Sequence, residues 1–345
     1  MFVKKNLGFR AALTFTGGHI IWLTAWAILV TWLYEYFDWA WMRIPWLPLS
    51  VIGVAVAFYI GFKNNQSYDR LWEARKIWGA IVNSSRAWGS NVRAYVTDQF
   101  SVINYSEEEL YAIKRRLIYR HMAWLYAHRS QLLLSTPWEH INQSMHIAWT
   151  TRKRMKRFGI GLLDDGISEK ALKDFLPAYE YDQLINFKNT ATQIIDRQSQ
   201  DLKYLREKDI IEDFRHMELQ KILNDFFVHQ GKNERIKKFP FPRQYGIMSF
   251  VFVAIFILLL PFGMVSEFAK LGEWGTWLSI PFTVLVAWVY LVMELVGDYS
   301  ENPFEGLGND IPMLALCRTI EIDLKEMLGE TDLPPEVEPI KGVLM

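Results

Sequence analysis

The stretch from Leu49 to Gly79 places the strongest constraint on how this chain can fold. Its first half, LSVIGVAVAFYIGF, contains only apolar or small residues, whereas its second half, KNNQSYDRLWEARKIWG, is rich in charge and aromatic rings. No proline occurs between Val51 and Gly79, and glycine is tolerated inside membrane helices. We therefore expect one long helix that crosses a bilayer and continues into water.

Three apolar side chains recur at four-residue spacing in this helix, so they lie along one face: Val54, Phe58 and Phe62. If several copies of the chain met around an axis, this stripe would form a hydrophobic constriction. The alternative is that it faces lipid or a neighbouring helix. Two features favour the pore. The other faces of the helix carry small residues, which allow close contact with neighbouring helices: Gly53, Ala55, Ala57 and Gly61. The stripe is followed by uncharged polar residues that would line a wet vestibule: Asn64, Asn65 and Gln66.

Three further apolar runs are long enough to cross a hydrocarbon core of about 30 Å at about 1.5 Å per residue: His19–Phe37, Tyr245–Met264 and Trp277–Val296. The chain contains 15 tryptophans, and their clustering near these runs is typical of interfacial aromatic belts. We expect an all-α membrane protein with four spans and a helical aqueous part, divided as 1–79, 80–242, 243–298 and 299–345.

Basic residues indicate the orientation of the spans. Lys4, Lys5 and Arg10 precede the first span, and Lys63 and Arg70 follow the second, while the connection between the two spans contains a single basic residue. Because basic residues are retained on the cytoplasmic side, the pattern predicts a cytoplasmic N-terminus and middle region. Four spans then return the C-terminus to the same side.

The aqueous part shows helical periodicity. Ser106 precedes an acidic first turn and an amphipathic segment, which is a typical helix start. Helices are expected from this start through 110–124, and at 181–205, 210–230 and 314–328. The proline-rich end of the chain, 333–345, is expected to be mobile.

The basic run RKRMKR, Arg152–Arg157, has two interpretations. It is either a solvated turn or a segment that contacts anionic lipid headgroups, because polybasic segments near membranes attract such lipids.

Composition and motifs argue against an enzyme and against nucleic-acid binding. The formal net charge is zero, and the single cysteine excludes an intramolecular disulfide and a four-thiolate zinc site. The seven histidines form no HExxH motif, and no dinucleotide-binding, P-loop or nucleophile-elbow motif occurs. We therefore expect no catalytic residues, no metal site and no cofactor. Glu294, near the end of the last span, is expected to be hydrated.

Four motifs make the chain identifiable by resemblance: SYDRLWEARKIWG (67–79), NERIKKFPFP (233–242), LPFGMV (260–265) and ENPFEGLGNDIPMLALCRTIEIDL (301–324). Together they resemble the bestrophins, and in particular the bacterial branch of that family. The resemblance covers nearly the whole chain in order. The region 120–174 fits least well and resembles an insertion.

The resemblance implies a homopentameric ion channel in the bacterial inner membrane, with both termini in the cytoplasm and one axial pore. The narrow apolar neck of such channels corresponds here to Val54, Phe58 and Phe62. A second, cytosolic aperture corresponds to Phe214, with Ile211 as the alternative. These rings have no fixed charge, so they would gate by excluding water.

The resemblance also bears on calcium. Eukaryotic relatives bind Ca²⁺ with an acidic run after the last span, and acidic residues supply the hard oxygen ligands that Ca²⁺ prefers. This chain retains Asn302 and Asp310 from that pattern, but Leu307 and Gly308 interrupt the run. The alternative interpretation of this stretch is a solvated turn.

Three functions stay open on these grounds. Family precedent favours a channel for chloride and other monovalent anions. A monovalent cation channel is the second possibility, and a non-conducting membrane scaffold or sensor is the third.

Overall fold

The computed structural model describes residues 1–3, 8–37, 39–158, 166–272 and 274–345. Within these ranges every regular element is helical, apart from two isolated β-bridges. The chain forms two compact units. We call them the membrane unit, which contains residues 4–71 and 240–302, and the extramembrane unit, which contains residues 1–3, 72–239 and 303–345.

The membrane unit contains α1 (Gly8–Phe37), the first part of α2 (Trp46–Tyr95), α9 (Arg243–Phe268) and α10 (Gly275–Asp298). Two short 3-10 turns, η1 (Ala40–Met42) and η4 (Ala269–Leu271), lie in its connections. Four helices in the described part are long and apolar enough to cross a membrane, which confirms the four expected spans. Lys4 and Lys5, which contribute to the predicted orientation, lie outside the described residues.

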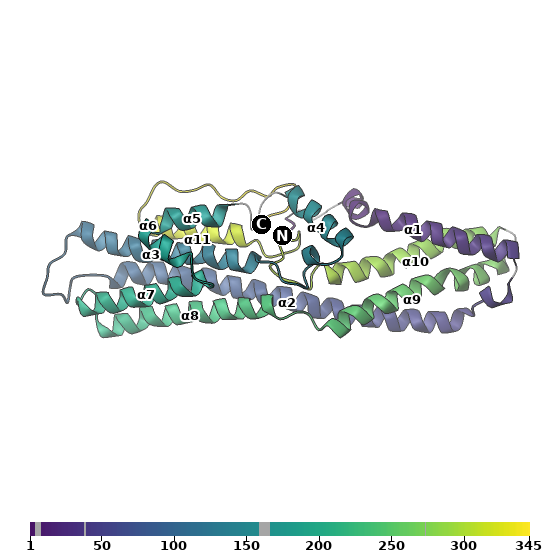
Figure 1. The fold of residues 1–345 in the computed structure, drawn as a ribbon, viewed down its shortest axis with the longest axis horizontal. Helices are drawn as coiled ribbons and strands as arrows, with labels where there is room; N and C mark the ends of the chain where they lie inside the picture. The colour runs from purple at the N-terminus through teal and green to yellow at the C-terminus, as the bar shows by residue number, and fades with distance from the viewer. Residues whose placement is uncertain (4–7, 38, 159–165, 273) are drawn as a thin grey trace. The chain divides into compact units, whose positions relative to one another are not determined.

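Helix α10 packs against both α9 and α1 (Figure 1). The buried core of the membrane unit draws on all four helices: Leu23, Leu49, Val56, Ile60, Val253, Phe256, Ile257, Leu260, Met264, Ala287 and Leu291. Apolar contact alone does not bring helices together in lipid, so close packing and polar pairs decide their arrangement.

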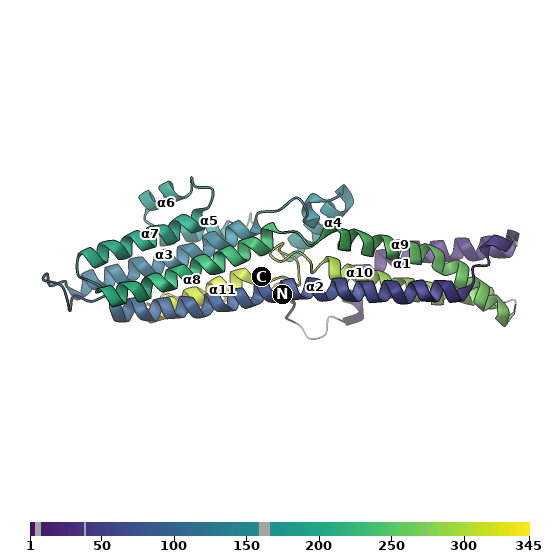
Figure 2. The ribbon, with the colours of Figure 1, turned by 90° about the horizontal axis from the view of Figure 1, so that it is seen from below.

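Figure 2 shows α2 as one uninterrupted helix of 50 residues. It is longer at both ends than the predicted 49–79. Its one proline, Pro48, lies in the first turn, where a missing backbone N–H costs nothing because the helix has no acceptor for it there. Residues up to Leu71 belong to the membrane unit, and the remainder belongs to the extramembrane unit.

A buried ion pair joins two spans of the membrane unit. Lys63 of α2 donates to Glu294 of α10, and Ser249 of α9 donates to the other oxygen of the same carboxylate. Lys63 and Glu294 are 3% and 4% exposed. The expectation that Glu294 is hydrated is therefore wrong: its charge is compensated by a lysine 231 positions away along the chain.

The extramembrane unit is built around α3 (Glu107–Leu133). Ser106 and Glu109 form a capping box at its start, with the Glu109 N–H 3.2 Å from Ser106 Oγ and the Ser106 N–H 2.8 Å from Glu109 Oε2. Helix α3 packs against α5 (Ile167–Phe175), α7 (Thr190–Glu207), α8 (Asp213–Lys238) and α11 (Met313–Met327), and Trp88 of α2 donates to its Leu117 O at 3.4 Å.

The helix predicted at 181–205 is in fact two helices, α6 (Ala178–Leu184) and α7. The break occurs because Asn189 caps α7, with its side chain accepting the Thr192 N–H at 3.0 Å. Helix α8 begins three residues later than predicted and continues to Lys238. Helix α11 matches the last predicted helix to within one residue at each end.

The region expected to be an insertion, 120–174, is partly anchored by its first residue. Arg120 donates to both oxygens of Glu180, at 2.6 and 3.1 Å, and to Asp201 at 2.7 Å. These charge-assisted bonds link α3 to α6 and α7. Residues 159–165 of the region lie outside the described residues.

Two other expectations are corrected by the extramembrane unit. The basic run 152–157 is not a turn but part of a helix, α4 (Met145–Phe158). The end of the chain is not free: Leu344 N–H donates to Met1 O at 2.8 Å, Phe2 bridges to Val343, and Val343 and Met345 are buried.

Two buried histidines of α3 predict acid sensitivity. His121 lies 2.9 Å from Ser85 Oγ, and burial lowers its pKa to about 3 and that of His128 to about 4. Both are neutral in the fold, whereas in the unfolded chain they bind protons below about pH 6.5. Stability should therefore fall as the pH falls from about 6.5, by up to about 1.4 kcal/mol per pH unit for each histidine.

Replacing His121 with phenylalanine should reduce the dependence of stability on pH, because the variant has one buried neutral histidine fewer. Ser85 Oγ keeps its hydrogen bond to Ile81 O at 2.7 Å, so the substitution does not leave this hydroxyl without a partner. Thermal unfolding in detergent at several pH values between neutral and pH 5 measures the slope. The matched control is His146→Gln, at an exposed histidine. An equal slope in the His121→Phe variant and the parent protein would contradict this assignment.

Candidate pore-lining site

The predicted neck residues lie on the uncovered face of α2. Val54, Phe58 and Phe62 are 71%, 68% and 53% exposed, whereas Ile60 and Lys63 are almost completely buried on the opposite face. Because a helix turns about 100° per residue, residues 54, 58 and 62 share one side while 56, 60 and 63 share the other. The chain's own helices thus cover one side of α2 and leave the stripe open.

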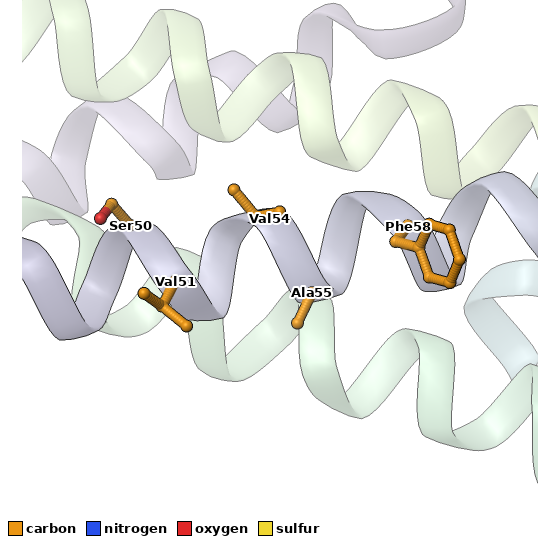
Figure 3. A pocket seen from close by; sticks show the side chains of 5 residues that line it. All are labelled: Ser50, Val51, Val54, Ala55 and Phe58. Carbon is orange, nitrogen blue, oxygen red and sulfur yellow. The ribbon is translucent and has the colours of Figure 1, made fainter.

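The stripe borders a shallow hollow on α2. Its lining residues are Ser50, Val51, Val54, Ala55 and Phe58, and Figure 3 shows that all five side chains project from α2 itself. The one polar group, Ser50 Oγ, donates to Leu47 O at 2.8 Å. The hollow therefore offers apolar surface and no ligating group.

Phe58 and Phe62 contact each other edge to face, with ring centroids 4.6 Å apart and planes at 90°. In this geometry the positive edge of one ring meets the negative face of the other, which stabilises the pair. The two rings act as one bulky apolar surface at the end of the stripe.

The polar residues after the stripe divide into two groups. Asn65 and Gln66 are exposed, as expected for a vestibule. Asn64 is half-buried and donates to Met293 O at 3.0 Å, so it contributes to the contact between α2 and α10 instead. Gly297 is required there, since a Cβ on it would lie 2.0 Å from Asn64 Oδ1.

The structure distinguishes the two candidates for the cytosolic aperture by their exposure. Phe214 lies in the first turn of α8 and is 77% exposed. Ile211 precedes α8 and is completely buried in the extramembrane unit, so it is not available to line an opening. Phe214 stays the candidate.

The candidate calcium residues form no metal site in the part of the chain that the structure describes, where no group of three His, Cys, Asp or Glu side chains is placed to hold an ion. Asp310 is turned into its own loop, with its carboxylate accepting backbone N–H groups from Phe304, Gly306 and Ile311 at 2.7–2.9 Å. Burial raises the pKa of Asp310, and these three donors act in the opposite direction. Asn302 is a buried residue of the membrane unit.

Three residues that stabilise the Asp310 loop were not predicted from the sequence: Glu139, His140 and Lys237. The backbone N–H of His140 donates to Glu305 at 2.6 Å, and its ring lies 2.9 Å from the same carboxylate. Lys237 pairs with Glu139 and donates to Phe304 O at 3.1 Å. Long-range pairs of this kind leave no local pattern in the sequence.

These contacts predict that calcium has little effect on the loop. Adding millimolar Ca²⁺ or a chelator should leave the thermal midpoint unchanged, because three backbone N–H groups already compensate the Asp310 carboxylate. Asp310→Asn should lower the free energy of unfolding by about 1–3 kcal/mol, since the amide nitrogen accepts no N–H bond. A calcium-dependent rise in the midpoint that Asp310→Asn abolishes would contradict this.

Four apolar spans, an extramembrane bundle of helices and an open apolar stripe on the second span define an all-helical, multi-pass membrane protein. Residues 17–326 match the family described as "Bacterial/Fungal Bestrophin protein". The chain belongs to this bestrophin family, as its four sequence motifs indicate.

Curated relatives are similar in sequence to most of the chain. It is 24% identical over 314 residues to the voltage-dependent anion channel-forming protein YneE of Escherichia coli (strain K12), covering 91% of this chain and 86% of that protein. A voltage-dependent anion channel-forming protein of Mesorhizobium japonicum is 27% identical over 292 residues, covering 85% and 77%. The crystal structure of a bacterial bestrophin homologue from Klebsiella pneumoniae has the same fold, with a TM-score of 0.72, 20% identity and coverage of 90% of this chain and 97% of that chain.

Proposed function

We propose that this protein is a passive channel for monovalent anions, with Val54, Phe58 and Phe62 as its neck. The main support is the apolar stripe in a candidate membrane span, which the chain's own helices leave more than half exposed at each position. The names of the curated relatives, which are anion channel-forming proteins, favour anions over cations.

The neck would act through its lack of polar groups. A ring of such side chains excludes water, and therefore ions, until it widens slightly. Phenylalanine edges are weakly positive and favour anions, whereas faces favour cations. Rings turned edge-on to the axis would thus pass chloride without a fixed binding charge.

A single copy of α2 encloses no pore, so the proposal requires an assembly. The family resemblance gives a homopentamer around one axis, in a bacterial inner membrane with both termini cytoplasmic. Phe214, exposed on α8, would form the second aperture of the same assembly.

The sign of the reversal potential tests the proposal. Purified protein in planar bilayers under a salt gradient should give currents that reverse toward the equilibrium potential of chloride. Reversal toward that of the cation would establish the monovalent cation channel instead. Liposome flux no greater than that of protein-free vesicles would leave a non-conducting scaffold or sensor.

A further inference from the structure

Helix α4 has an unusual outward face. Its exposed residues are Met145, His146, Trp149, Arg152, Lys153 and Lys156, which fall within one side of the helix at 100° per residue. Met145 is 89% exposed and Trp149 is 60% exposed. No acidic residue occurs anywhere in α4, so nothing on the helix neutralises these cations.

The opposite face of α4 holds the helix on its own unit. Thr151 and Met155 are buried, and Ile147 and Ala148 are half-buried. On the outward face, Lys153 Nζ lies 5.0 Å from the centre of the Trp149 ring. The cations and the large apolar side chains therefore form one continuous surface, rather than a charged face and a separate apolar one.

This combination differs from an ordinary solvated helix. A basic helix face that contacts only water is not expected to carry a tryptophan and a methionine among its lysines. Tryptophan prefers the boundary between water and lipid, and each lysine or arginine near an anionic membrane contributes about 1 kcal/mol of attraction. Basic helices with exposed tryptophan are typical of segments that lie on a membrane surface.

The described part of the chain has four helices that are long and apolar enough to cross a membrane. A bilayer is therefore always present beside this protein, which favours lipid over a soluble acidic partner for the outward face of α4.

We propose that the outward face of α4 docks on the headgroups of anionic phospholipids, with Arg152, Lys153 and Lys156 as the contacts for lipid phosphates and Trp149 as the interfacial anchor. This docking is independent of which ion the protein conducts.

An environment-sensitive fluorophore on Met145→Cys tests the docking in the full-length protein. The native Cys317 is completely buried, so the new thiol can be labelled selectively. In vesicles that contain phosphatidylglycerol, the emission should shift to the blue relative to vesicles of phosphatidylcholine alone. High salt should reverse the shift, because it screens exposed charges.

In the same labelled background, Arg152→Gln/Lys153→Gln/Lys156→Gln should abolish the shift. The matched control removes three exposed lysines from α7 and α8, with Lys203→Gln/Lys221→Gln/Lys232→Gln, and should keep it. Emission that is equally blue in both lipids, or in detergent, would overturn the proposal in favour of burial against protein. A shift that survives both high salt and the triple substitution in α4 would overturn it as well.

Discussion

Replacing Phe58 and Phe62 together with alanine is expected to raise single-channel conductance several-fold. The two rings are the bulkiest side chains of the stripe, and their removal leaves a wider and less tightly dewetted passage. Because both rings are largely exposed, their removal should lower the stability of the chain by no more than about 1.5 kcal/mol, the upper value for an edge-to-face pair. Single-channel recording in planar bilayers gives the conductance, and the thermal midpoint shows whether the fold is intact.

Phe250→Ala is the matched control for this experiment. Phe250 is also an exposed phenylalanine of a membrane span, at 63%, but it lies on α9. Its removal should leave the conductance unchanged. If the double alanine variant and the control conduct like the parent protein, the stripe is not the neck.

Replacing Lys63 with methionine is expected to lower the free energy of unfolding by about 3–5 kcal/mol. The substitution leaves the Glu294 carboxylate buried between spans with Ser249 as its remaining donor, and an unpaired buried charge is costly. The double variant Lys63→Met/Glu294→Met should recover most of the loss, because it removes both charges. Thermal stability in detergent, followed by size-exclusion chromatography, measures the three proteins.

The exposed pair Lys270–Glu267 is the control for that series. Its side chains are 69% and 38% exposed, so Lys270→Met should cost no more than about 1 kcal/mol. A Lys63→Met variant as stable as Lys270→Met would show that the buried pair does not hold α2 against α10.

The spans and the stripe were predictable from the sequence because they depend on local periodicity. Val54, Phe58 and Phe62 repeat at helical spacing, and each span is a continuous apolar run. Which side of α2 packs against other helices was left open, because Ile60 is as apolar as the stripe and only the structure shows it buried. The role of the stripe as a neck stays a prediction.

Long-range pairing was not predictable in the same way. Nothing near Glu294 in the sequence indicates that Lys63 compensates it, and nothing near Glu305 indicates His140. The break before Asn189 was missed because the apolar period continues across it, although the Asn189 side chain caps the start of a separate helix. Of the two interpretations of the basic run 152–157, the solvated turn was wrong: its charges suggest solvent, but none of its residues disfavours a helix.

The buried pair between Lys63 and Glu294 also restricts the ways in which a neck built on α2 can widen. Lys63 directly follows Phe62, so a rotation of α2 about its own axis that moved the Phe58 and Phe62 rings would also separate the Lys63 ammonium group from the Glu294 carboxylate. Breaking the pair costs about 3–5 kcal/mol, so that movement is unfavourable. We therefore expect dilation by sideways translation of α2 together with α10, or by flipping of the phenylalanine rings, since both movements leave the charge pair in contact.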